Sequence, residues 1–398
     1  MVVRSLVLAL PLSAALMLAA CGGHSANTNT ANATKALPPA NPIAVGKMVQ
    51  GVGAAKDGQR DRAVSLLKEA IGIDPNLWEA RFNLGVVLAG AGDLAGAEDQ
   101  LRQASKLAPE VQDVIVALAE VEKRRGEHHA AADLLGDFVQ AHPQALDART
   151  LLVEALRNSG QLDKAIEQGQ EVLVRKPGDA AALGELALCH LAKGERETAQ
   201  LLAKQALDSN AKSALAHRAM GLIQLQNGDD ALAFQSFLRA SQEDPHDTTA
   251  RLNMGGVLLH AGRYDKAEEQ FRAILQVSPD DIEAQLGLAA AVRGQADAHS
   301  PAKLEEAKSL LTKVLERDPH NIAALYNLGV LYADFLKRPA DAMPLFQRFL
   351  SDAPSDHPAR ADAEKYLAGA TKPAPTAPTT PPPTTKGGKP QGGKGPSK

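Results

Sequence analysis

The chain has 398 residues, of which 44% are hydrophobic but only 3% aromatic, and 43 basic against 47 acidic residues give a formal net charge of −4. This mildly negative balance argues against a nucleic-acid-binding surface. Abundant Ala and Leu with few aromatic side chains are typical of closely packed helices and not of a β-sandwich or barrel. Because the chain has only two cysteines, we expect apolar packing and not disulfides to stabilise the fold.

The N-terminus has a basic start at Arg4, followed by the apolar run SLVLALPLSAALMLAA that ends before Cys21. This is the layout of a secretory signal, and it falls short of the roughly 20 apolar residues that a membrane-spanning helix needs. The stretch Leu18-Ala19-Ala20-Cys21 resembles the lipobox of bacterial lipoproteins. The resemblance implies a signal peptide over residues 1–20 and acylation of Cys21 with fatty acids such as palmitate. An ordinary signal peptide with a coincidental cysteine and an uncleaved anchor are the alternatives.

Gly22 follows the cysteine, at the place where an Asp is the usual signal for retention at the inner membrane in this lipoprotein family. The resemblance therefore implies an outer-membrane lipoprotein that faces the periplasm, with surface exposure as the alternative. Residues 21–41 carry few apolar side chains and no periodicity, so we expect a flexible tether between the lipid and the folded body.

Residues 42–354 repeat with a period of 34 residues, in which a glycine, an alanine and a proline recur. The recurring positions are Gly58, Gly92, Gly126, Gly160, Gly194, Gly228 and Gly262; Ala63, Ala97, Ala131, Ala165, Ala199, Ala233 and Ala267; and Pro75, Pro109, Pro143, Pro177, Pro245 and Pro279. We expect two helices per unit: the glycine permits the tight turn between them, the alanine lets the second helix approach the first, and the proline ends the second helix.

This pattern resembles the tetratricopeptide repeat, and NLWEARFNLGVVLAGAGDLAGAEDQLRQASKLAP and NIAALYNLGVLYADFLKRPADAMPLFQRFLSDAP match it well, the second with one extra residue. The step from Pro279 to Pro319 is 40 residues, which places an insertion near GQADAHS. The resemblance implies an all-α fold, a right-handed α-solenoid of about nine helix-turn-helix (TPR) repeats. Residues 355–370 predict a C-terminal cap helix, with Asp356 as its candidate N-cap.

Residues 371–398 are rich in Pro, Thr, Gly and Lys and contain no acidic residue, which predicts an extended, disordered tail. Its five lysines make it a basic arm on an acidic body. A solvated linker is the favoured interpretation, and contact with anionic cell-wall polymer or lipid headgroups is the alternative.

The sequence contains none of the motifs HExxH, CxxC, a nucleophile elbow or a phosphate loop that opens a helix. His128 and His129 predict a solvated pair near a turn, whereas Cys189 and His190 predict a buried thiol and a hydrogen-bonded histidine. We therefore expect no enzyme activity, no metal and no cofactor, with a carrier or hydrolase hidden in the solenoid as the alternative.

The tetratricopeptide resemblance implies that the second, fifth, ninth and twelfth residues of each unit lie on the concave side. In the third and fourth repeats these are charged: Asp113, Glu120, Lys123, Asp147, Glu154 and Arg157. In the fifth to ninth repeats they are mostly apolar: Leu188, Leu191, Leu215, Leu222, Leu225, Leu252, Leu259, Leu286, Tyr326 and Val330. We expect this apolar stripe to bind an amphipathic helix or extended segment of a partner, with the charged half fixing its direction. The alternative is that the groove closes on itself, or that the cap helix or the insertion after Gly294 covers it.

The lipobox, the tandem repeats and the final unit ALYNLGVLYADFLKRPADAMPLFQRFL together resemble the TPR lipoproteins of the myxobacterial adventurous gliding motility machinery (GltE-like). The resemblance implies a non-catalytic scaffold for protein–protein interaction in an envelope-spanning complex, with motility proteins as partners. Two other roles stay open: a pilotin-like lipoprotein that helps a type IV pilus secretin assemble, and an adaptor that recruits peptidoglycan enzymes. We expect no nucleic-acid partner.

Overall fold

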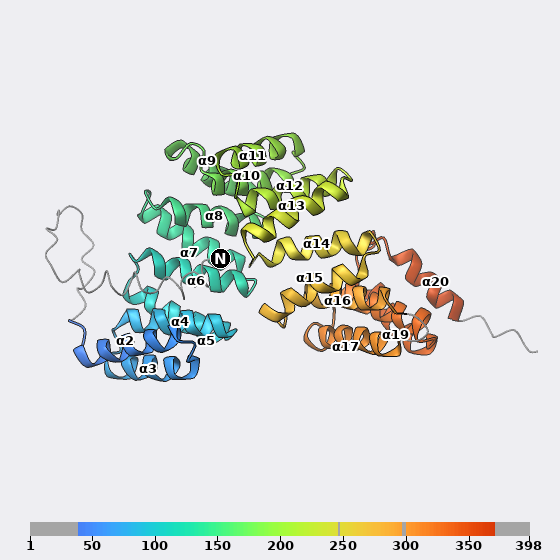
Figure 1. Ribbon diagram of the computed structural model, residues 1–398, viewed down its shortest axis with the longest axis horizontal. Helices are drawn as coiled ribbons and strands as arrows, with labels where there is room; N and C mark the ends of the chain where they lie inside the picture. Colours follow the sequence, from blue (N-terminus) through green and yellow to red (C-terminus); the bar gives the residue numbers. More distant parts are fainter. Residues whose placement is uncertain (1–38, 246, 297–299, 371–398) are drawn as a thin grey trace, which may run out of the picture. The chain divides into compact units, whose positions relative to one another are not determined.

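The computed structural model describes residues 39–370, except residues 246 and 297–299. All regular secondary structure in these ranges is helical (Figure 1). None of the helices there is both long and apolar enough to cross a membrane. The predicted signal peptide, Cys21 and the basic tail lie outside the described residues.

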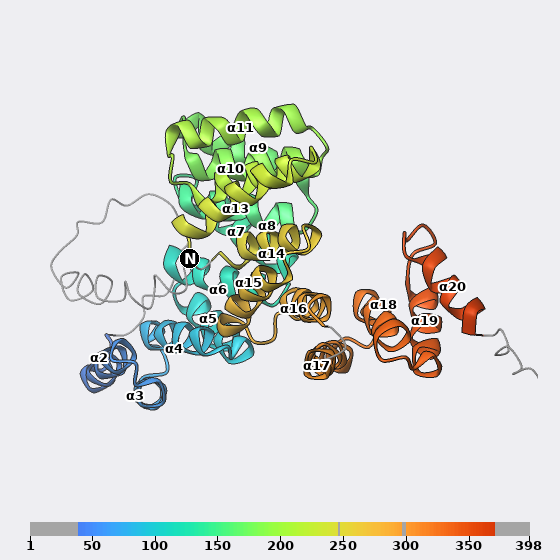
Figure 2. The same cartoon turned by 45° about the vertical axis from the view of Figure 1, so that its right-hand side comes forward.

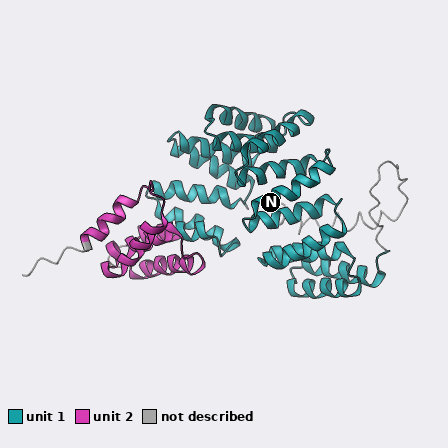
Figure 3. Cartoon of the chain, turned by 180° about the vertical axis from the view of Figure 1, so that it is seen from behind, with its two compact units in different colours: residues 1–287 teal, residues 288–398 magenta. Residues whose placement is uncertain are grey.

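The helices come in pairs, one pair per repeat, which confirms the predicted α-solenoid. The first helices of the pairs, called A helices below, are α2 (Pro42–Lys56), α4 (Trp78–Ala91), α6 (Gln112–Arg124), α8 (Leu146–Asn158), α10 (Ala180–Ala192), α12 (Ala214–Gln226), α14 (Thr248–His260), α16 (Ile282–Gly294) and α18 (Ile322–Val330). The second helices, the B helices, are α3 (Arg60–Ile73), α5 (Leu94–Leu107), α7 (His128–Ala141), α9 (Leu162–Arg175), α11 (Arg196–Ser209), α13 (Asp230–Glu243), α15 (Tyr264–Val277), α17 (Pro301–Arg317) and α19 (Pro339–Asp352). The chain forms two compact units, residues 1–287 (unit 1) and 288–398 (unit 2), which are coloured separately in Figure 3.

The turns between the helices of a pair explain the recurring glycines. All seven have a positive φ, between 69° at Gly262 and 88° at Gly92, a backbone conformation that a Cβ atom disfavours. The last repeat lacks this glycine, and Lys337 takes the positive φ, at 55°. A π-helical turn, η1 (Leu331–Phe335), extends α18, and its wider turn accommodates the extra residue that the sequence places in this repeat.

The B helices of unit 1 connect successive repeats. Each B helix from α3 to α13 packs against its own A helix and against the A helix that follows. A helices also contact one another, as α8, α10 and α12 do. The seven recurring alanines have no exposed surface, which confirms that small residues let the two helices of a pair approach. The A helices of unit 1 follow one another in a row (Figures 1 and 2). We call the surface that this row forms the inner face of unit 1.

Two adjacent glycines of α14 allow a test of how closely the two helices of a pair, α14 and α15, approach each other. A Cβ atom at Gly255 would lie 2.6 Å from Cζ of Phe271 on α15, whereas one at Gly256 would have no neighbour within 4 Å. We expect Gly255→Ala to lower the free energy of unfolding by about 1–3 kcal/mol, because the ring must shift in a packed core. Gly256→Ala should raise it by about 0.5–1 kcal/mol through helix propensity. Urea denaturation measures both variants, and changes of the same sign would contradict this packing.

The last described helix of unit 2 is α20 (Arg360–Ala370), which packs against α19. The ring of Tyr366 on α20 stacks on Phe346 of α19, with 4.6 Å between the ring centroids. The expected N-cap is not confirmed, because Asp356 lies in a turn before the helix begins. The sequence between Asp356 and α20 contains Pro358, and a residue that precedes a proline is disfavoured in a helix.

Candidate binding surface

Charged side chains connect successive A helices on the inner face of unit 1. Lys123 of α6 lies 2.9 Å from Glu120 of the same helix and 2.6 Å from Glu154 of α8. Its side chain is only 12% exposed. Burial lowers the pKa of Lys123, but Glu154 and Glu120 together raise it by more, so the ammonium group stays charged.

The same pattern continues into the next repeats. Nε of Arg157 on α8 donates to Glu185 on α10 at 2.9 Å, and the Glu185 side chain is 5% exposed. Arg218 on α12 contacts Asp247, the N-cap of α14, at 3.1 Å. Ion pairs therefore link the A helices in steps, from α6 to α8, from α8 to α10 and from α12 to α14. We call Glu120, Lys123, Glu154, Arg157 and Glu185 the charge ladder.

Four of the six charged residues that the sequence placed on the concave side belong to the charge ladder. The other two, Asp113 and Asp147, are exposed in the first turns of α6 and α8. Sequence reasoning missed Glu185, which lies outside the four expected positions of the repeat. Its signal was an acidic residue within the apolar helix AAALGELALCHLA.

The leucines expected to follow the charged section divide into two groups. Leu188 and Leu191 are each 6% exposed and pack with Ile223 in one core cluster. Leu215 and Leu222 are half-buried against the same cluster. The structure thus places the beginning of the expected open stripe in the core, since α10 and α12 pack closely together. The remaining unit 1 positions, which we call the leucine row, are half-buried: Leu225, Leu252, Leu259 and Leu286.

The last two expected groove residues lie in unit 2. Tyr326 and Val330 are half-buried and pack against a core cluster that contains Phe346. The Tyr326 hydroxyl donates to Asp362 of α20 at 2.6 Å. Burial, followed by the Asp362 carboxylate, raises the pKa of Tyr326 to about 12, so its hydroxyl remains a donor at neutral pH. The cap helix therefore covers Tyr326, one of the alternatives that the sequence left open.

Cys189, His190 and His129 have the surroundings expected of them, whereas His128 is less solvated than expected. Cys189 is fully buried, and burial raises the pKa of its thiol to about 12. Nδ1 of His190 lies 2.6 Å from a carboxylate oxygen of Glu195. His129 is exposed, whereas His128 is half-buried. Within the described ranges, no group of three or more His, Cys, Asp and Glu side chains could hold a metal ion.

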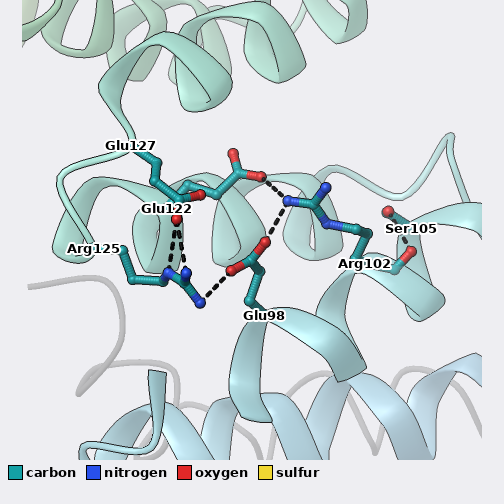
Figure 4. A network of polar contacts seen from close by, with 6 residues as sticks. All are labelled: Glu98, Arg102, Ser105, Glu122, Arg125 and Glu127. Atoms are coloured by element: carbon teal, nitrogen blue, oxygen red, sulfur yellow. Dashed lines mark hydrogen bonds and ion pairs between the residues drawn. The ribbon is translucent and has the colours of Figure 1, made fainter. Parts of the chain in front are cut away.

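A second polar network joins α5 to α6, as Figure 4 shows. Arg102 lies 3.0 Å from Oε1 of Glu122, while Oε2 of Glu122 is buried without a hydrogen-bond partner in the structure. Glu98 and Glu127 approach Arg125 to 2.6 Å and 2.9 Å. Glu122 is 3% exposed, and its burial is the largest cause that raises its pKa, to about 7. The nearby carboxylates of Glu98 and Glu127 also raise this pKa, whereas the two arginines of the network lower it.

The raised pKa of Glu122 predicts that the free energy of unfolding depends on pH. Because its pKa is about 7 in the folded state and about 4.3 in an unfolded chain, the folded state binds more protons between these values. Stability from this group is therefore lost as the pH rises from 5 to 8, by on the order of 2 kcal/mol. Glu122→Gln should remove that loss, whereas the matched change Glu167→Gln, at an exposed side chain of α9 outside this network, should keep it. Urea denaturation at several pH values measures this, and parallel profiles for wild type and Glu122→Gln would contradict it.

The fold and its inner face together define a class of protein: an α-solenoid of helical hairpins that presents an extended surface to protein partners. The chain belongs to the tetratricopeptide repeat family. One tetratricopeptide repeat model matches residues 54–121, 224–292 and 301–365, and a second one matches residues 116–180 and 184–248.

Curated relatives share parts of this chain. Cellulose synthase operon protein C of Komagataeibacter xylinus is 28% identical over 168 residues, which cover 41% of this chain and 12% of that protein. Protein O-mannosyl-transferase TMTC1 of Homo sapiens is 25% identical over 197 residues, 50% of this chain and 19% of that protein. The chain thus spans less than a fifth of the length of these relatives. Among solved structures, the APC/C hetero-tetramer Cut9–Hcn1 is 15% identical, with a TM-score of 0.50 over 83% of this chain and 76% of that one, a likeness of fold alone.

Proposed function

We propose that this protein is a non-catalytic scaffold that binds a segment of a partner protein on the inner face of unit 1. The observation that carries this proposal is the change of character along one face, from the charge ladder on α6, α8 and α10 to the half-buried leucine row on α12, α14 and α16. An amphipathic helix or extended segment can place spaced apolar anchors on the leucines. Charges fixed by ion pairs at one end set its direction.

The scaffold is a lipoprotein of the bacterial outer membrane, anchored through Cys21 and facing the periplasm. The support is the lipobox at Leu18 to Cys21, with Gly22 after the cysteine. Several acyl chains on one residue anchor a protein more firmly than a single chain, at about 0.8 kcal/mol per buried methylene.

The host assembly is the gliding-motility machinery, for which the support is the combination of lipobox, tandem repeats and the final repeat unit. Chemical crosslinking in intact envelopes, followed by purification of this protein, tests that assignment directly. Crosslinked motility proteins support it, whereas a pilus secretin or peptidoglycan enzymes in their place would replace it.

The anchor is tested by Cys21→Ser, which should leave an unprocessed precursor without acyl label that fails to reach the outer membrane. Metabolic labelling with a palmitate analogue and membrane fractionation measure both effects, with Cys189→Ser as the matched control because Cys189 is buried in the repeats. An unlabelled wild type, together with normal fractionation of the Cys21→Ser variant, would refute the anchor.

A further inference from the structure

Helix α2, the first A helix, has an outer side that is open to solvent. Ile43 is 66% exposed and Val49 is 49% exposed. A Cβ atom built at Gly46 or Gly53 would meet no atom within 4 Å. At 100° per residue these positions point to the same side of the helix. We call this side the α2 face: Ile43, Gly46, Val49, Gln50 and Gly53.

The same side of later A helices is buried by the preceding repeat. The positions that follow Gly46 at steps of 34 residues have no exposed surface: Ala80, Val114, Ala148, Ala182, Ala216, Ala250 and Ala284. Helix α2 has no preceding pair among the described residues and stands at the blue end of the row in Figure 2. Among the described helices of unit 1, its outer side is therefore the A-helix side that the packing of the repeats leaves uncovered.

The α2 face differs in composition from an ordinary solvent-exposed helix surface. Helix α20, at the other end of the solenoid, exposes Glu364 and Lys365. Helix α2 has no acidic residue, exposes two large apolar side chains, and carries Lys56 on the same side. The repeat that it begins, residues 41–75, has five basic and four acidic residues, whereas residues 42–370 together have 36 basic and 47 acidic residues. The first repeat therefore has a balance of one positive charge, whereas the described helices together are acidic.

We propose that the α2 face docks on an anionic lipid surface. Apolar side chains that enter the headgroup boundary and a nearby basic side chain are the two features that hold an amphipathic helix there. Lys56 supplies the basic side chain beside the α2 face, whereas Lys47 is paired with Glu69 at 2.7 Å. The inference rests on the proposed anchor for its orientation: Cys21 precedes Pro42 by about 20 residues, which makes α2 the described helix nearest to the acylated end along the chain. A second copy of the chain fits less well, because a stable dimer needs about 20–30 residues on each side and the face offers two large apolar ones.

Vesicle sedimentation tests the docking with residues 22–370. This chain holds all the described helices but lacks Cys21, the apolar N-terminal run and the basic tail. It should sediment with vesicles of phosphatidylglycerol and phosphatidylethanolamine, less in high salt, and little with pure phosphatidylcholine. The double variant Ile43→Asp with Val49→Asp should bind about tenfold more weakly. The matched control is Val174→Asp with Leu232→Asp, at side chains that are 75% and 50% exposed, and it should bind as the wild type does.

Equal sedimentation of the wild type and of the Ile43→Asp, Val49→Asp variant overturns the docking. Light scattering gives a second outcome that overturns the docking. If the molar mass falls in this variant while vesicle binding stays the same, the α2 face joins two copies of the chain. Circular dichroism melts confirm that each variant is folded. Because these chains lack Cys21, a failure here leaves the lipid anchor standing, and a failure of acyl labelling on the full chain leaves the docking standing.

Discussion

Replacing Arg157 by leucine is expected to lower the free energy of unfolding by about 3–5 kcal/mol. Nε of Arg157 donates to Glu185 at 2.9 Å, and the Glu185 side chain is 5% exposed, so the substitution leaves a buried carboxylate without its partner. Leucine is the matched replacement, because Leu191 and Leu225 occupy the same place in the next two repeats. Urea denaturation of the purified protein measures the loss.

The loss should grow as the pH rises. Burial already raises the pKa of Glu185, and without Arg157 the folded protein must keep this carboxyl group protonated. The folded state then binds more protons than the unfolded state above about pH 4, so stability falls with increasing pH. The control is Arg157→Leu combined with Glu185→Leu, which removes both charges, refills the space and should recover most of the loss. A single Arg157→Leu variant as stable as the wild type would show that this pair does not tie α8 to α10.

Leu188→Asp should be far more damaging than a substitution in the leucine row, with a loss of about 4 kcal/mol or more. Leu188 is 6% exposed and packs with Ile223 in the core, so the substitution buries a charge that has no partner. Partner capture then fails only because the protein unfolds. A thermal melt detects this directly.

Leu252→Asp combined with Leu259→Asp should separate binding from stability. Both side chains are half-buried on α14 and two turns apart, so each substitution should cost about 1 kcal/mol. Capture of the crosslinked partner should nevertheless be lost, because the leucine row then carries two negative charges. A stability loss as large as that of Leu188→Asp would show that the leucine row is core, and capture that survives both substitutions would place the binding surface elsewhere.

The repeat period was enough to predict the fold of this protein. The recurring glycines meet a local requirement, a positive φ in the turn of each pair, and the recurring alanines meet another, contact between the two helices of that pair. Requirements of this kind depend on residues close together in the chain, so the sequence displays them once per unit. The same register also placed Lys123 and Glu154 on the inner face correctly, since their direction depends only on their positions in the helix.

The exposure of the inner-face side chains to water could not be predicted from the sequence and became clear only in the three-dimensional structure. A Cβ atom at Gly184 of α10 would lie 2.9 Å from Cγ of Leu215 on α12, so the glycine lets these two A helices approach each other. Leu188 and Leu191 are buried as a result, although the sequence pattern gives them the same face as Leu259. The distance between neighbouring A helices depends on side chains from two repeats together, and helical periodicity describes only one helix at a time. The partnership of Glu185 with Arg157 and the cover of α20 over Tyr326 came from the tertiary structure for the same reason.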